Sequence, residues 1–190
     1  MTYKMLVIGS SAGGTPLIGR LLAVLPKDYP LAVAIVAHLS QDYESNLAQQ
    51  LDALTDLPVT AARDKEPIVA GHVYVAPPDY HLLVEKIHEA TFALSDHEPV
   101  KSVRPSIDML FSSAAEVFGA SLIAVMLSGA NSDGADGMAV VKELGGLCIV
   151  QDPLEAEFSA MPNAAIQKVA ADYIVGLEDI ISLLVSVDEK

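Results

Sequence analysis

The sequence predicts an α/β fold: a doubly wound, mostly parallel sheet with helices on both faces, in three α/β/α layers, plus a small β-hairpin. Short apolar runs alternate with helical patterns along the 190 residues, as in sheets whose strands are joined by crossover helices. Most runs are continuously apolar, which is typical of strands buried on both faces. Apolar residues make up 52% and charged residues 19%, a globular composition.

The N-terminal part of the chain predicts a strand–helix–strand unit. Residues 4–8 form an apolar run that stops at a series of small residues, so a strand is expected there. A helix is expected at residues 15–25, with Thr15 as the N-cap and Pro16 at the first helical position. The next strand is expected at residues 32–37.

The following segment continues the alternation. A helix is expected at residues 43–55, with Asp42 as a candidate cap, and short strands at 59–61 and 73–76. The hairpin is expected from residues 82–94, where two alternating runs flank a short polar connection.

The C-terminal half repeats the pattern of helix and buried strand. Pro105 precedes a helical pattern, and further apolar runs follow it at short intervals. The expected helices are 106–118, 134–144, 162–168 and 177–187, and the expected strands are 122–127, 147–150 and 173–175. This length and organisation predict a single domain over residues 1–190.

Composition also bounds the setting and the partners. The longest apolar runs are far shorter than the roughly 18 residues that a membrane-spanning helix needs, so no membrane insertion is expected. A net charge of −14 disfavours nucleic acid as a partner. Cys148 is the only cysteine and no secretory signal is evident, which favours a cytoplasmic location.

Reactive side chains follow three of the expected strands, where open parallel sheets bind their ligands. Ser10 and Ser11 come after the first strand, and His38 follows the second. The loop after residues 122–127 holds five more polar residues: Ser128, Asn131, Ser132, Asp133 and Asp136. A hydroxyl, an imidazole and a carboxylate at one sheet edge are the components of nucleophilic acyl transfer.

The stretch Gly9-Ser10-Ser11-Ala12-Gly13 matches G-x-S-x-G, a turn that projects a serine between a strand and a helix. In this register Ser11 is the candidate nucleophile. The pattern by itself also fits a structural turn or a phosphate-binding loop.

The other candidates have structural alternatives as well. His38 fits an ordinary hydrogen-bonded loop residue, and Asp133 fits a turn former or a helix cap. Ser128 and Ser132 remain alternative hydroxyls. No His, Cys, Asp or Glu cluster has the spacing of metal ligands, so no metal is expected. Acyl transfer by a hydroxyl, an imidazole and a carboxylate requires no cofactor, so none is expected.

Several motifs in the same order extend this interpretation over residues 5–184. They are VIGSSAGG, IVAHLSQD, GHVYVAPPDYHL, RPSIDMLFSSAA, LSGANSDGADGM and IVQDPLEAEFSAMPNAAI. In these motifs the chain resembles the catalytic domain of the bacterial chemotaxis protein-glutamate methylesterases (CheB type). The resemblance implies a serine hydrolase that removes methyl esters from glutamate side chains of chemoreceptors and, in many members, deamidates glutamines.

The resemblance also implies site residues. The triad falls on Ser11, His38 and Asp133, and the oxyanion donors on the backbone N–H groups of Ala12 and Ala130, where family members often carry Thr and Met.

Weaker substrate-binding candidates are Arg104, in VRPSID, and Met161, in SAMPN. Arg104 fits a carboxylate contact equally well, and Met161 fits simple packing.

The implied partner is a methylated chemoreceptor or a related signalling protein, with a methyltransferase or a regulator acting in trans. Well-known members carry an N-terminal receiver domain, and the sequence is expected to be a stand-alone member without one. The alternative from another class is a non-catalytic anion-binding, nucleotide-binding or signalling module on the same fold.

Overall fold

The computed structural model describes residues 2–38 and 46–189 and confirms the predicted fold class. Seven parallel strands form one sheet in the order β3-β4-β2-β1-β7-β8-β9. Its strands are β1 (Met5–Ser10), β2 (Ala32–Ala37), β3 (Val59–Ala61), β4 (Val73–Val75), β7 (Leu122–Met126), β8 (Leu147–Gln151) and β9 (Tyr173–Val175). The antiparallel hairpin, β5 (His81–Lys86) and β6 (Ala90–Ser95), is separate from this sheet.

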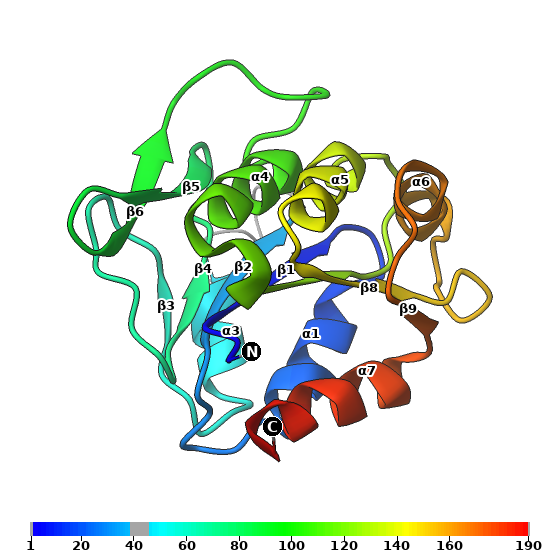
Figure 1. Cartoon of the computed structure of the whole chain (residues 1–190), viewed down its shortest axis with the longest axis horizontal. Helices are drawn as coiled ribbons and strands as arrows, with labels where there is room; N and C mark the ends of the chain where they lie inside the picture. The colour runs from blue at the N-terminus through cyan, green and yellow to red at the C-terminus, as the bar shows by residue number, and fades with distance from the viewer. Residues whose placement is uncertain (1, 39–45, 190) are drawn as a thin grey trace.

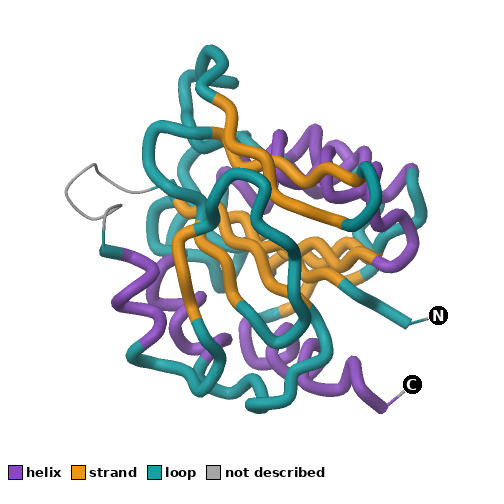
Figure 2. The backbone as a smooth tube through the Cα atoms, turned by 90° about the vertical axis from the view of Figure 1, so that its left-hand side faces the viewer, coloured by secondary structure: helices purple, strands orange, loops and turns teal. Residues whose placement is uncertain are grey.

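Helices cover both faces of the sheet (Figure 1). They are α1 (Thr15–Leu22), α3 (Leu47–Asp52), α4 (Ile107–Phe118), α5 (Ala135–Glu143), α6 (Ala160–Lys168) and α7 (Leu177–Val185), with 3-10 turns η1 (Gly119–Ser121) and η2 (Ser186–Glu189). In Figure 1, α4, α5 and α6 lie above the sheet, whereas α1, α3 and α7 lie below it. Figure 2 shows the hairpin on the side of the upper helices, where the Val84 N–H donates to Ser113 Oγ of α4 (3.0 Å).

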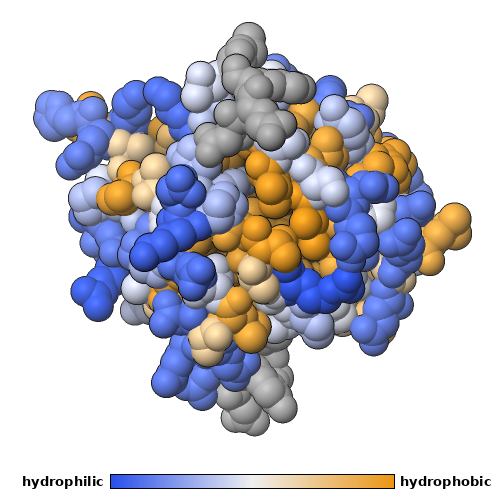
Figure 3. Space-filling model, turned by 90° about the horizontal axis from the view of Figure 1, so that it is seen from below, coloured by the Kyte–Doolittle hydropathy of each residue, from blue (hydrophilic) through white to orange (hydrophobic). Residues whose placement is uncertain are grey.

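Side chains of the central strands alternate between two hydrophobic layers. In β1, Met5 and Val7 pack into the upper layer, and Leu6 and Ile8 pack into the lower one. All four are fully buried, as expected for a strand covered on both faces. Figure 3 shows the lower face from outside, with hydrophobic residues gathered around its middle.

Several predicted element boundaries differ from the structure, most of them by one to three residues. Gly14, not Thr15, is the N-cap of α1, and no side chain caps this helix, because the turn after β1 runs directly into it. The predicted helix 43–55 is observed as α3, Leu47–Asp52, while its first residues and Asp42 lie outside the described residues.

A close approach between α4 and β1 brings a helix N-terminus to the strand ends. A Cβ at Gly9 would lie only 2.4 Å from Ile107 Cγ2, at the first residue of α4. Glycine therefore allows α4 to start directly above the end of β1. The free N–H groups of this helix then face the loop that follows β7.

Within the described ranges, no helix is long and apolar enough to cross a membrane.

Candidate active site

The carboxyl ends of β1, β2 and β7 bring the predicted serine and histidine together. The register pairs Ser10 with Ala37, so the next residues, Ser11 and His38, follow neighbouring strand ends. The His38 N–H donates to the Ser10 carbonyl (3.0 Å), and the Ser11 N–H donates to the Ser128 carbonyl beyond β7 (3.0 Å). The strand order reverses between β1 and β7: β2 and β4 follow on one side of β1, and β7, β8 and β9 on the other. Open α/β sheets bind their ligands at such a reversal.

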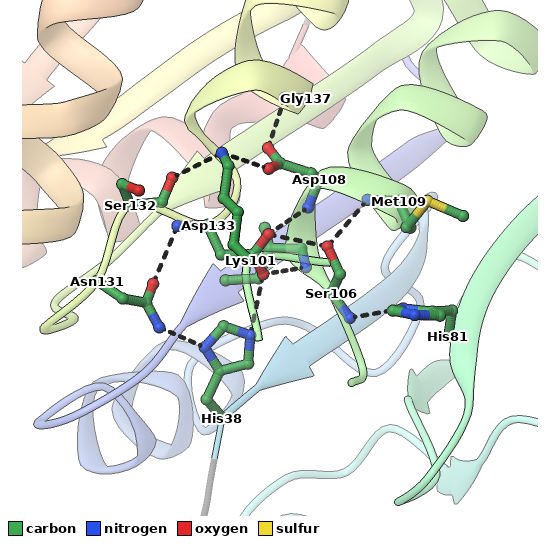
Figure 4. Close-up of polar contacts among 11 residues, drawn as sticks. His38, His81, Lys101, Ser106, Asp108, Met109, Asn131, Ser132, Asp133 and Gly137 are labelled. Atoms are coloured by element: carbon green, nitrogen blue, oxygen red, sulfur yellow. Dashed lines mark hydrogen bonds and ion pairs between the residues drawn. The ribbon is translucent and has the colours of Figure 1, made fainter. Parts of the chain in front are cut away.

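His38 and Asp133 are in direct contact. His38 Nε2 lies 3.0 Å from Asp133 Oδ2, and the side chains are 11% and 0% exposed (Figure 4). This distance is typical of an ion pair. The angle at Nε2 is too poor for the contact to count as a hydrogen bond. A positive charge developing on the imidazole would lie next to a buried carboxylate.

Asp133 is held by the N-terminus of α4. Its Oδ1 accepts from Ser106 Oγ (2.8 Å) and the Asp108 N–H (3.3 Å), and its Oδ2 accepts from the Ile107 N–H (2.6 Å). The helix α5 that follows Asp133 has Gly134 as its N-cap, so this carboxylate caps a neighbouring helix instead of its own.

This environment sets the charge state of Asp133. Burial raises the pKa of the carboxyl, but contacts with His38, the Ile107 N–H and Ser106 outweigh it and lower the pKa below its ordinary value. The Asp133 carboxyl is therefore ionised in the folded protein near neutral pH.

Ser11 is partly exposed at the turn after β1, whereas Ser10 is fully buried within the strand. A Cβ at Gly14 would lie 2.8 Å from Ser10 Oγ, so this hydroxyl is covered by the turn. Of the two serines, only Ser11 is open to a substrate.

The backbone N–H groups of Ala12 and Ala130 make no hydrogen bond to any other residue in the described ranges. Both belong to loops at the ends of β1 and β7. They match the requirement for an oxyanion site, which is a free donor near the nucleophile.

Ser128 joins these two loops through its buried hydroxyl. Its Oγ donates to the Ala12 carbonyl (2.8 Å) and accepts from the Phe158 N–H (3.0 Å). Since this hydroxyl is fully buried and already bonded, it is unsuited to attack a substrate. The other alternative, Ser132, is exposed, and its carbonyl accepts from Lys101 Nζ (3.2 Å).

Arg104 and Met161, the weaker candidates, lie in different surroundings. Arg104 donates through Nη1 to the carbonyls of Asp96 (2.8 Å) and His97 (3.1 Å), in the segment after the hairpin. Met161 is 1% exposed and packs against Gly129, where an added Cβ would lie 2.7 Å from its sulfur.

Three groups around Asp133 were not identified as functional from the sequence. Asn131 bridges His38 and Asp133: its Nδ2 lies 3.1 Å from His38 Nδ1, and its Oδ1 accepts from the Asp133 N–H (3.0 Å). His81 is fully buried, with Nδ1 accepting from the Ser106 N–H (3.2 Å). The loop that holds Asn131 can be identified as a candidate site from the sequence, because it follows a strand. No sequence signal indicates the direction of the Asn131 amide.

Lys101 is the third such group. It lies 2.7 Å from both Asp108 and Asp136, and so ties the start of α4 to the start of α5. Burial raises the pKa of Asp108 above its ordinary value despite this cation, whereas Lys101 and Lys168 lower that of Asp136 to about 2. Metal-binding clusters of three or more His, Cys, Asp or Glu are absent from the described part of the chain.

Comparison with known proteins places the chain in a family. A family model described as CheB methylesterase matches residues 6–184. The chain belongs to the CheB methylesterase family. A relative from Leptospira interrogans is 44% identical over 190 residues, which are 100% of this chain and 97% of the relative.

Longer members of the CheB methylesterase family match the chain over about half of their length. A relative from Hydrogenovibrio crunogenus, named protein-glutamate methylesterase/protein-glutamine glutaminase, is 36% identical over 100% of this chain and 50% of its own. The crystal structure of the Thermotoga maritima CheB methylesterase catalytic domain superimposes with a TM-score of 0.93 at 33% identity, covering 98% of this chain and 100% of that one. The 190 residues therefore correspond to the catalytic domain of this family.

Proposed function

We propose that this chain is a serine hydrolase that removes methyl esters from glutamate side chains of chemoreceptor-type proteins. Ser11 is the nucleophile, His38 is the general base and acid, and Asp133 orients the imidazole. The observation that carries the proposal is the contact between His38 and a buried, ionised Asp133 beside the end of β1, after which the partly exposed Ser11 follows. The names of the relatives support the same substrate class.

The reaction proceeds in two halves. Ser11 Oγ attacks the γ-carbonyl carbon of the glutamyl ester while His38 takes the hydroxyl proton. The carbonyl oxygen becomes negative and accepts from the N–H groups of Ala12 and Ala130. The tetrahedral intermediate then collapses, His38 returns the proton to the departing methoxide, and methanol leaves.

The second half restores the enzyme. Water, deprotonated by His38, attacks the glutamyl ester formed with Ser11. Collapse of the second intermediate releases the glutamate side chain, and the proton on His38 returns to Ser11 Oγ. A glutamine substrate follows the same steps with ammonia as the leaving group, which fits the double name of the relatives.

Asp133 contributes through charge. The imidazolium formed in both halves lies next to a carboxylate that is held ionised by the start of α4. In a buried site such an ion pair favours the charged intermediate far more than it does in water.

The experiment is mass spectrometry of methylated receptor peptides incubated with the protein, read as loss of one methyl group per site. Ser11→Ala and His38→Gln should lower the rate by about 10⁴- to 10⁶-fold. Ser132→Ala, which removes the exposed hydroxyl beyond β7, should keep the activity and serves as the matched control. Turnover that survives Ser11→Ala would contradict the assignment, and binding of the peptide without turnover would favour a non-catalytic module.

A further inference from the structure

The second ring nitrogen of His38 has a partner that the proposed triad does not require. Nε2 faces Asp133, whereas Nδ1 lies 3.1 Å from Asn131 Nδ2 (Figure 4). Asn131 lies two residues before Asp133 in the loop after β7, so one short loop contacts both nitrogens of the ring.

The orientation of the Asn131 amide is determined by its other end. Its side-chain oxygen accepts from the Asp133 N–H (3.0 Å), and a backbone N–H can only donate. The NH₂ end must therefore face the imidazole. Since an amide NH₂ also only donates, His38 Nδ1 acts as the acceptor and carries a lone pair in the neutral ring, with the proton on Nε2.

This hydrogen bond also holds the ring in place. The contact of Nε2 with Asp133 is poorly aligned, so the bond from Asn131 is the well-formed hydrogen bond of the imidazole within the described part of the chain. Asn131 is itself anchored to the backbone of Asp133. The imidazole therefore contacts the Asp133 carboxylate and the Asn131 amide, and this amide in turn contacts the Asp133 backbone, so the direction of the Nδ1 lone pair depends on the amide.

We propose that Asn131 is a positioning residue for His38, which makes Nδ1 the proton-accepting nitrogen and holds the ring until the Ser11 hydroxyl replaces the amide there. The inference rests on the proposed function of Ser11 and His38. When substrate is bound, the proton passes from Ser11 Oγ to Nδ1 and then from Nδ1 to the leaving group. Because protonated Nδ1 no longer accepts, the amide is displaced during this step, while Nε2–H remains against Asp133.

The first test reads the proton positions directly and needs no activity. Two-bond ¹H–¹⁵N spectra of ¹⁵N-histidine-labelled protein, with His38→Gln to assign one of the five histidines, should show an unprotonated Nδ1 and a protonated Nε2 in the neutral ring. Asn131→Asp keeps the acceptor for the Asp133 N–H but puts an acceptor opposite Nδ1, so a proton should appear on Nδ1. A wild-type ring protonated on Nδ1, or an unchanged spectrum in Asn131→Asp, would overturn the proposal.

The second test is kinetic. Asn131→Ala should lower kcat by about ten-fold, and Asn131→Asp by about 100-fold or more, with KM nearly unchanged in both, because a well-placed general base contributes about 10²- to 10⁴-fold. Asn163→Asp makes the same chemical change at an exposed position of α6 and should leave kcat and spectrum unchanged. A higher kcat in Asn131→Ala would mean that the amide only blocks Nδ1, which would overturn the positioning role.

The two proposals fail in distinguishable ways. If Ser11→Ala keeps its activity while the spectra show the expected change in Asn131→Asp, the proposed nucleophile is wrong and the effect of Asn131 on the ring stands. If Ser11→Ala is inactive and the Asn131 variants match the wild type in both tests, the hydrolase proposal stands and the role of Asn131 is wrong.

Discussion

Replacing Asp133 by asparagine should lower both the stability and the proposed activity of the protein. The carboxylate accepts from three groups at the start of α4: Ser106 Oγ, the Ile107 N–H and the Asp108 N–H. Its side chain is fully buried, so none of these donors can turn to water instead.

The loss can be estimated from these contacts. In Asp133→Asn, an amide oxygen at the position of Oδ2 still accepts from the Ile107 N–H, but this acceptor is no longer charged. The amide NH₂ group then takes the position of Oδ1 and faces Ser106 Oγ and the Asp108 N–H. The serine hydroxyl can turn to accept, whereas the Asp108 N–H is left facing another donor. Hydrogen bonds to charged groups contribute about 1.5–3 kcal/mol and neutral ones about 0.5–1.5 kcal/mol, so the total loss is about 3 kcal/mol.

Thermal unfolding measures this loss. For a domain of this size about 3 kcal/mol corresponds to a decrease in Tm of roughly 6–12 °C. Ester hydrolysis should fall about 10⁴-fold in the same variant, because the ring loses the charge that stabilises its protonated form. Asp136→Asn is the matched control: this carboxylate is 51% exposed and, among the described residues, pairs with Lys101 and Lys168, so its change should stay below about 1 kcal/mol.

The pH dependence provides a second check. Because the pKa of Asp133 is lowered in the folded protein, its stabilisation is complete above the unfolded value of about 3.9 and is lost as pH falls through the folded pKa. The part of the difference in unfolding free energy between wild type and Asp133→Asn that comes from ionisation of this carboxyl should therefore shrink as pH falls through its folded pKa. Equal Tm values for Asp133→Asn and Asp136→Asn at pH 7 would refute the reasoning.

Three further outcomes are expected. Burial raises the pKa of Cys148 to about 12, so Ellman's reagent should label it only after unfolding in guanidinium; rapid labelling of the native protein at pH 8 would contradict its burial. Gly129→Ala should destabilise the protein by about 1–3 kcal/mol through overpacking against Met161, and Met161→Ala in the same chain should recover part of this; fully additive losses would argue against the contact. Lys101→Met should raise the pKa of Asp136 from about 2 toward its ordinary value, as followed by NMR titration of its carboxyl, and an unchanged titration would show that Lys168 alone sets it.

Much of the fold could be predicted because its signals are local. Continuous apolar runs identified the strands, and β2 and β9 were predicted with the bounds that the structure has. Boundaries that depend on loop paths were less accurate: Thr15 was assigned as an N-cap, whereas the turn after β1 places Gly14 there. Packing against other elements decides such details, and it leaves little trace in the local sequence.

Local sequence signals also predicted which residues belong to the candidate site, but not all of their contacts. Parallel strands end at one edge, so Ser11 and His38 were expected at the same edge of the sheet from their positions alone. The structure adds that β1 and β2 are neighbours, with the residues before Ser11 and His38 paired in register. The contact of the carboxylate with the start of α4 was not predicted, because α4 precedes Asp133 by many residues and reaches it only where Gly9 lets the helix approach β1.

By itself, then, the sequence determined which segments form the sheet, which edge carries the reactive side chains, and which serine, histidine and aspartate to consider. Only the tertiary structure decided that Asp133 caps a different helix, that Ser128 is buried, and that an amide from Asn131 faces His38. The physical reason is range: hydrophobic periodicity is set by neighbours along the chain, whereas hydrogen-bond direction depends on atoms brought together from distant segments.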